Sequence, residues 1–165
     1  MTQPVSVNLD AILLPTDGLE DAQIESSARS IYSSTFLGGN KVGTSQCHDG
    51  SRVLFFADQF DHAFYTSSNR SRYPDKKDII ALERVQRINW IKPVIEGKVT
   101  KTACYQFFDY NTKRTKRFYL VPEYFYVVWL EPRMAGGWKF ATAYKATIDN
   151  LRRYCKGGVK IWVAP

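Results

Sequence analysis

Tyr124-Phe-Tyr-Val-Val-Trp-Leu130 is the stretch of sequence that decides the fold, because it is apolar or aromatic at every position. Successive side chains of a β-strand point to opposite faces of the sheet, so a strand without a polar face belongs in the interior of a sheet. We therefore expect residues 124–131 to form a central strand that helices cover on one side.

Three further strands are predicted around this segment, at residues 100–109, 114–120 and 138–145. The turns between them are short and contain Asn, Pro or Gly, which interrupt regular structure. Four short strands joined in this way form an antiparallel meander. In the last of them, alternation with a period of two sends four side chains to one face: Trp138, Phe140, Thr142 and Tyr144.

Before the meander, the sequence predicts a helix over residues 19–37 and a hairpin over residues 42–57 that turns at Asp49-Gly50. A long amphipathic helix is predicted from Pro74, to end or kink at Pro93. Its apolar residues recur at a spacing of three: Ile79, Leu82, Val85, Ile88 and Ile91. A short helix over 148–154 and a strand over 159–163 follow the meander.

The predicted class is therefore α+β, with an N-terminal helix and hairpin and one long amphipathic helix packed on a four-stranded antiparallel β meander. A chain of 165 residues is the size of one domain, which we expect to span residues 1–165. The three cysteines, Cys47, Cys104 and Cys155, are widely spaced, which favours reduced thiols in a cytoplasmic protein over disulfides or a zinc site. No export signal or membrane-spanning run is visible, so no membrane partner is expected.

Positive charge is concentrated in the later part of the chain. Residues 1–65 hold three basic and eight acidic residues, a net of −5, and the remainder holds twenty basic and eight acidic, a net of +12, which together give +7. Such a field attracts polyanions, of which nucleic acid is the commonest. The alternative is that the lysines merely keep the protein soluble.

The two histidines differ in their surroundings. His48 lies beside the Asp49-Gly50 turn, where we expect an exposed imidazole without a role. His62 lies between aromatic residues at the start of a predicted polar loop that also carries Arg70 and Arg72. An imidazole exchanges protons near pH 7, so His62 is the candidate for proton transfer. The alternative is a histidine that packs in the loop and bonds to the backbone.

Several other side chains could bind phosphate. Arg84 and Arg87 lie beside the apolar stripe of the predicted long helix, where arginines either cover apolar neighbours or bind phosphate oxygens. Thr142 and Tyr144 could contact a phosphate through their hydroxyls, or could be ordinary sheet residues. The sequence has no phosphate-binding glycine loop, dinucleotide-binding motif or paired acidic cluster for metals, so we expect no cofactor and no metal. A nuclease without a metal ion would act on RNA, because the 2′-hydroxyl of RNA is an internal nucleophile.

Three features occur in a suggestive order: His62, the segment Ala81-Leu-Glu-Arg-Val-Gln-Arg-Ile-Asn-Trp-Ile91, and the strand Lys139-Phe-Ala-Thr-Ala-Tyr144. This order resembles the barnase–EndoU–colicin E5/D–RelE superfamily of ribonucleases, and most of all its phage-associated branch. The resemblance covers residues 58–146, which would form the nuclease core between an N-terminal part (1–57) and a C-terminal part (147–165). It implies helices packed on one face of a four-stranded sheet whose other face carries the RNA site.

The resemblance also implies roles for individual residues. His62 would be the acid or base, Arg84 a transition-state or positioning cation, and Thr142 and Tyr144 the strand residues of the active face. Many members are toxins restrained by an immunity protein or antitoxin, which implies an acidic inhibitor as a partner. The predicted function is a metal-independent endoribonuclease that cleaves tRNA or mRNA and leaves a 2′,3′-cyclic phosphate.

Two other functions stay open. The first is a nucleic-acid-binding or phage accessory protein without catalysis, which would use Tyr105, Phe107 and Tyr110 as an aromatic platform. The second is a protein-binding domain with an acidic partner. The residues expected to contact nucleic acid are Arg70, Arg72, Lys113, Arg114, Lys116, Arg117 and Lys139.

Overall fold

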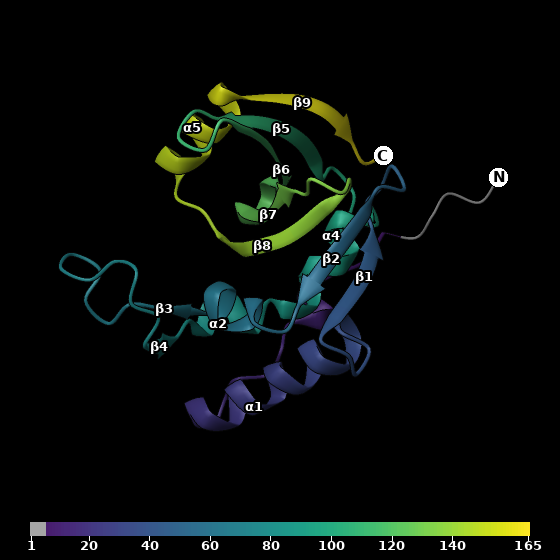
Figure 1. Ribbon diagram of the computed structural model, residues 1–165. Helices are drawn as coiled ribbons and strands as arrows, with labels where there is room; N and C mark the ends of the chain where they lie inside the picture. The colour runs from purple at the N-terminus through teal and green to yellow at the C-terminus, as the bar shows by residue number, and fades with distance from the viewer. Residues whose placement is uncertain (1–5) are drawn as a thin grey trace.

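The computed structural model describes residues 6–165, and in this part of the chain seven strands form one mixed sheet in the order β1-β2-β8-β7-β6-β5-β9 (Figure 1). The strands are β1 (Val42–Gln46), β2 (Arg52–Phe56), β5 (Ala103–Asp109), β6 (Arg114–Val121), β7 (Tyr126–Pro132), β8 (Trp138–Lys145) and β9 (Gly158–Val163). The α+β class predicted from the sequence is thus observed.

Strand β7 lies at the middle of the sheet, which confirms the prediction made from its two apolar faces. Val128 and Leu130 on one face are fully buried, and so is Val127 on the other. Trp129, beside Val127, is almost fully buried as well. The strand is covered on both sides, whereas we expected helices on one side only.

The prediction of a four-stranded sheet was wrong, because the sheet has seven strands. Strands β5, β6, β7 and β8 are antiparallel neighbours as expected, but the sheet continues beyond them at both edges. The hairpin β1–β2 joins through a parallel pairing of β2 with β8, at Val53↔Trp138 and Leu54↔Lys139, and β9 pairs antiparallel with β5. Short turns reveal which strands are hairpin neighbours, but pairings between distant segments leave no local mark in a sequence.

The helices of the described chain surround this sheet. They are α1 (Asp21–Ile31), which continues into a π-helical turn (Tyr32–Phe36), then α2 (Gln59–Phe64), α3 (Leu82–Gln86), α4 (Ile91–Ile95) and α5 (Ile148–Gly157). Short 3₁₀ turns occur at Leu9–Ile12, Ile88–Trp90 and Pro122–Tyr124. The predicted helix over residues 19–37 is therefore confirmed apart from its ends, and the predicted helix over 148–154 corresponds to α5.

The single long helix predicted after Pro74 was wrong. Ile79 and Ile80 instead form β4, a two-residue strand that pairs with β3 (Tyr65–Thr66), and the helical part is divided into α3, a 3₁₀ turn and α4. Arg87 separates the pieces with φ −104° and ψ 16°. A spacing of three buries one residue per turn in each short piece, as it would in one long helix. Pro93 lies in the first turn of α4, where its missing N–H removes no helical hydrogen bond.

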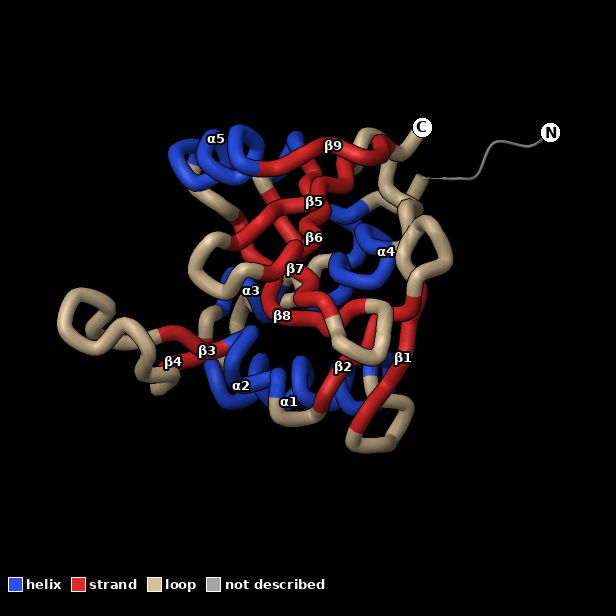
Figure 2. The backbone as a smooth tube through the Cα atoms, turned by 45° about the horizontal axis from the view of Figure 1, so that its top comes forward, coloured by secondary structure: helices blue, strands red, loops and turns tan. Residues whose placement is uncertain are grey.

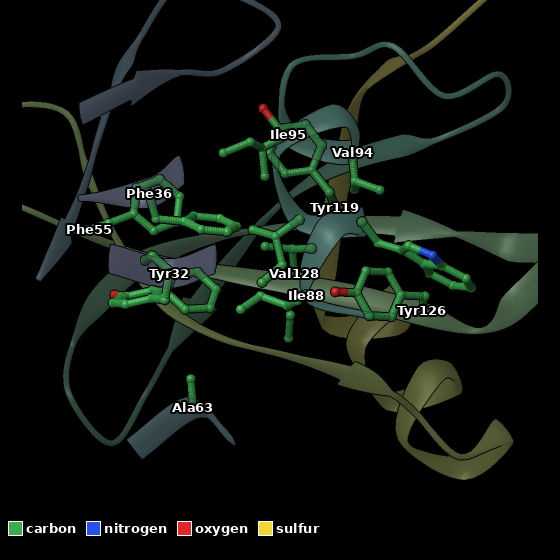
Figure 3. Packing of buried hydrophobic residues seen from close by; sticks show 14 of the residues in the cluster. Tyr32, Phe36, Phe55, Ala63, Ile88, Val94, Ile95, Tyr119, Tyr126 and Val128 are labelled. Atoms are coloured by element: carbon green, nitrogen blue, oxygen red, sulfur yellow. The ribbon is translucent and has the colours of Figure 1, made fainter. Parts of the chain in front are cut away.

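Two apolar cores fill the two faces of the sheet. The larger contains the helical turn at Tyr32 and Phe36, which packs against Phe55 of β2, and it extends to Tyr126 under α3 and α4 (Figure 3). The smaller joins Phe118 and Trp129 of the sheet to Tyr154 of α5, which lies beside β5 and β9 (Figure 1). Within residues 6–165, no helix has the length and apolar character needed to cross a membrane.

The loop between β3 and β4, residues 67–78, projects away from the rest of the molecule (Figures 1 and 2). Asp78 closes its base by accepting hydrogen bonds from the backbone and the hydroxyl of Ser68, at 2.8 and 2.6 Å. Arg70 and Arg72, expected in a polar loop, are both exposed in it. We call the loop of residues 67–78 the arm. Its base, β3 and β4, lies between α2 and α3 in the chain, so the arm extends from these two helices.

Candidate functional site

A cleft of about 580 Å³ opens on the α5 face of the sheet, and three of the four predicted catalytic residues line it. His62 comes from α2, and Thr142 and Tyr144 come from β8. The aromatic side chains of Trp129 and Tyr154 form part of its wall. The elements that meet here are separate in sequence, so the fold gathers these residues.

A β-bulge in β8 decides which side chains enter the cleft. Trp129 of β7 is opposite Thr142, but the next residue, Leu130, is opposite Phe140, so Ala141 is an extra residue in β8. A bulge shifts the alternation of a strand and occurs often beside active sites. Phe140 therefore packs in the larger core, whereas Thr142 and Tyr144 face the cleft. The prediction that all of these side chains share one face with Trp138 was wrong.

His62 lies on helix α2, whereas the sequence predicted a loop at this position. Gln59, one turn earlier on α2, is buried and donates from Nε2 to the carbonyl oxygen of Ala141, the bulge residue, at 2.5 Å. This bond ties the helix that carries the imidazole to the strand that carries the hydroxyls. The relative position of the three cleft residues is thus set by a buried contact.

The pKa of His62 is lowered from its ordinary value. Partial desolvation is the largest cause, the positive charges of Lys77, Lys139 and Arg84 lower the pKa further, and the carboxylate of Glu131 opposes them. The imidazole is consequently neutral at pH 7 and can accept a proton. Glu131 lines the same cleft.

The two hydroxyls of β8 differ in their bonding. The Oγ1 atom of Thr142 is buried and has no hydrogen-bond partner in residues 6–165. The hydroxyl of Tyr144 lies 2.7 Å from that of Tyr154, and burial, followed by this hydrogen bond, raises the pKa of Tyr144. Tyr144 therefore stays protonated at neutral pH and can donate a proton or a hydrogen bond.

Arg84, the fourth predicted residue, lies on the other side of Tyr144. Its guanidinium carbon is 5.1 Å from the centre of the Tyr144 ring, and Nη1 donates to the Ala63 carbonyl at 3.2 Å. It lines a second hollow of about 520 Å³, together with Arg70. The two hollows share Tyr144 and Tyr154 as a common wall. In the part of the chain that the structure describes, no carboxylate lies within 4.0 Å of this guanidinium.

The other predicted contacts with nucleic acid are spread more widely. Lys116 lines the first cleft and pairs with Asp109 at 2.9 Å, and Lys139 lies over the Phe56 ring at 5.3 Å. Lys113 and Arg114 are exposed at the β5–β6 turn, away from the second hollow, and Arg72 lies beside Tyr73 in the arm. The cations whose charges lower the pKa of His62 are Lys77, Lys139 and Arg84.

Arg117 was wrongly predicted to contact nucleic acid, because it is only 4% exposed. Its guanidinium donates to Asp49 at 3.0 Å and to Ser51 at 3.1 Å, and it lies over the Trp138 ring at 4.7 Å. The proposed aromatic platform fails in part for the same reason, since Tyr105 is buried and only Tyr110 is widely exposed. Neighbours on a strand point to opposite faces, so Lys116 faces the cleft while Arg117 is directed into the protein.

Asp49→Asn is expected to lower the free energy of unfolding by about 2 kcal/mol at pH 7, a reduced estimate for breaking a buried ion pair because this carboxylate is partly exposed. Desolvation would raise the pKa of Asp49, but hydrogen bonds from Arg117 and Ser51 outweigh it and hold the pKa well below its ordinary value. The stabilisation is complete above the unfolded pKa of about 3.9 and is lost as the pH falls toward the folded pKa. Urea unfolding at pH 7 and pH 3 should show the difference between variant and parent shrinking in acid. Asp149→Asn, in an exposed pair, is the control that should change neither.

His48 is neither exposed nor idle, contrary to expectation. Its Nδ1 lies 2.7 Å from the hydroxyl of Tyr119, and its ring stacks on Trp162 at 3.9 Å. The pKa of His48 is lowered from its ordinary value. Burial is the largest cause, the charge of Asp49 opposes it, and the charge of Arg117 adds to it. This histidine belongs to the packing between the hairpin and the sheet, away from the cleft.

The sequence did not indicate four residues of the site: Gln59, Lys77, Glu131 and Tyr154. Glu131 is the residue before the last of the central strand β7, and a carboxylate after an apolar run could have indicated that the strand reaches the surface there. The other three carry no pattern of their own, because their roles depend on α2, α5 and the arm meeting at β8.

Comparisons with family models, with curated proteins and with solved structures give no match to this chain. Within residues 6–165, no group of three or more His, Cys, Asp and Glu side chains is arranged to hold a metal ion. The cleft offers the neutral imidazole of His62, four hydroxyls and two carboxylates, with guanidinium and ammonium groups around them. The hydroxyls belong to Tyr110, Thr142, Tyr144 and Tyr154, and the carboxylates to Asp109 and Glu131.

Proposed function

We propose that this protein is an endoribonuclease that cleaves RNA through the 2′-hydroxyl and leaves a 2′,3′-cyclic phosphate, with no metal ion in the reaction. One observation carries the proposal: His62, Thr142 and Tyr144 line a single cleft, with Arg84 behind Tyr144. We also propose that the chain is related to the barnase–EndoU–colicin E5/D–RelE superfamily of ribonucleases that its sequence resembles. The residues that correspond to these four would form the active face in that superfamily.

In the proposed reaction, the 2′-oxygen attacks the adjacent phosphorus while neutral His62 accepts the 2′-proton. The bond from phosphorus to the 5′-oxygen of the next nucleotide breaks, and that oxygen takes a proton from the Tyr144 hydroxyl. Tyr144 regains its proton from solvent, and His62 returns its proton to solvent after the product leaves. When RNA enters the cleft, the Thr142 side chain turns about its Cα–Cβ bond and brings its buried, unpartnered hydroxyl to the cleft surface, where it donates a hydrogen bond to a phosphate oxygen. The surrounding cations stabilise the added negative charge.

The charge around the cleft supports RNA as the substrate. The positive groups that lower the pKa of His62 would be neutralised by a phosphate, which would strengthen binding at low salt. An acidic inhibitor protein would compete for the same surface. Binding of nucleic acid without cleavage is the outcome that would remove the catalytic proposal.

The test uses a short RNA in EDTA and a matched oligonucleotide with one 2′-deoxy position. We expect cleavage of the RNA, a product lighter by one water than the linear phosphate, as mass spectrometry measures, and no cleavage at the 2′-deoxy position. Cleavage at the 2′-deoxy position would show that the 2′-hydroxyl is not the nucleophile. Tight binding with intact RNA would leave a binding protein.

A further inference from the structure

We propose that the second hollow is a phosphate subsite, where Arg84 and Arg70 hold the phosphate next to the scissile one, so that a single strand of RNA crosses Tyr144. The assignment of the scissile phosphate to the first cleft rests on the proposed function. The binding of a phosphate in the second hollow does not depend on it.

The first argument is the arrangement of the two hollows. Tyr144 and Tyr154 line both of them, so a strand bound in the first cleft passes into the second across these two side chains. Arg84 lines the second hollow and not the first. Its place on the far side of Tyr144 suits a cation that positions a neighbouring phosphate better than one that contacts the reacting phosphorus.

The second argument is a group of like charges, Arg70, Lys77 and Arg84, none of which forms a salt bridge within residues 6–165. Burial lowers the pKa of Arg84, and Arg70 lowers it further against the effect of Tyr144. Partial desolvation lowers the pKa of Lys77, and both arginines lower it further against the effect of Asp75. Arg70 therefore makes the charged forms of Arg84 and Lys77 less stable, and Arg84 does the same to Lys77. An anion between them removes this repulsion, and phosphate matches guanidinium groups by accepting two hydrogen bonds at once.

The third argument is the polar character of the hollow. Lys145 adds another positive charge, and Thr147 and Asn150 at the start of α5 also line the hollow. Glu83 is the single carboxylate among the lining residues, and it is exposed on α3. Arg70 lines the hollow from the arm, the loop between β3 and β4.

This inference is tested with a fluorescein-labelled trinucleotide of 2′-O-methyl RNA, which cannot be cleaved because its nucleophile is blocked. It has two phosphodiester linkages, and either one can be replaced by a neutral methylphosphonate. Anisotropy at low salt measures the affinity of the parent protein for the three forms. We expect each neutral linkage to weaken binding by about 10-fold or more, because about 10-fold is the lower end of the effect of a hydrogen bond to a charged group.

The variants Arg70→Gln and Arg84→Gln identify the subsite. In both, the penalty for one particular neutral linkage should disappear, while the penalty for the other linkage remains. Arg70→Gln is the safer variant because Arg70 is exposed, whereas Arg84 also bonds to Ala63 and requires a melting curve as a check. Arg152→Gln, on an exposed part of α5, is the matched control and should keep both penalties.

The possible results separate this inference from the proposed function. Loss of one penalty in the two arginine variants supports the subsite, even if the protein does not cleave RNA. Equal penalties in parent and variants, or no penalty for either linkage, would overturn the subsite even if cleavage occurs.

Discussion

His62→Ala is expected to lower the rate of RNA cleavage by about two to four orders of magnitude, the usual contribution of a positioned acid or base. The side chain is exposed on α2 and makes no hydrogen bond that the fold requires, so the protein should melt at an unchanged temperature. Single-turnover cleavage of a defined RNA, with circular dichroism of the same preparation, measures both effects. Undiminished cleavage by a folded His62→Ala protein would remove His62 from the mechanism.

The pH dependence of the parent gives a second measure of the same residue. Because the pKa of His62 is lowered by desolvation and neighbouring cations, kcat/KM for the free enzyme should fall in acid with a midpoint below the ordinary histidine value of 6.5. Lys139→Gln should move this midpoint upward by removing one of those cations. Arg152→Gln changes a distant charge and should leave the midpoint in place.

Phe140→Ala is expected to lower the free energy of unfolding by about 3–5 kcal/mol, the range for large-to-small changes in a core. Phe140 is fully buried, and its ring stacks on Phe55 at 5.2 Å, so the truncated side chain leaves a cavity between β8 and β2. Urea unfolding followed by tryptophan fluorescence gives the value.

Thr142→Val is the control two residues along the same strand. The Oγ1 atom of Thr142 has no partner in the described chain, so its replacement by a methyl group should leave stability unchanged or raise it slightly. Cleavage should fall because the phosphate loses a hydrogen-bond donor. Equal losses of stability in both variants would contradict the bulge, which places the two side chains on opposite faces.

Much of the sheet could be predicted from the sequence because the determining information is local. The two apolar faces of residues 124–130 placed β7 at the centre, and short turns identified its neighbours β6 and β8. The turn at Asp49-Gly50 likewise identified the hairpin of β1 and β2. Each of these features depends on a few adjacent residues.

The remaining features depend on contacts between distant segments. Apolar residues at Ile79, Val85 and Ile88 fit one helix, and only the pairing of Ile79 and Ile80 with β3 shows that the chain is extended there. Strand β6 is apolar on both faces beyond Arg117, so alternation could not tell whether Lys116 or Arg117 faces solvent. The bulge at Ala141 reverses which face of the sheet the following side chains of β8 point to, and no residue type in the strand indicates it.

His62 and the two β8 hydroxyls were recognised as candidates by their chemistry, since few residue types exchange protons or donate to phosphate at neutral pH. Their meeting in one cleft could not be derived from the sequence, because it requires the contact between Gln59 and Ala141. The position of Arg84 in the second hollow could not be derived from the sequence either, because it results from the packing of Arg84 against Tyr144, which lines both hollows.

The parallel pairing of β2 with β8 also governs the order in which the protein is completed. A meander forms between neighbours, whereas this pairing must wait for the long intervening chain to close, which is slow. Helix α2 follows β2 almost directly, so His62 arrives at the cleft together with that late pairing. The cleft needs both α2 and β8, so it is complete only when this pairing has formed.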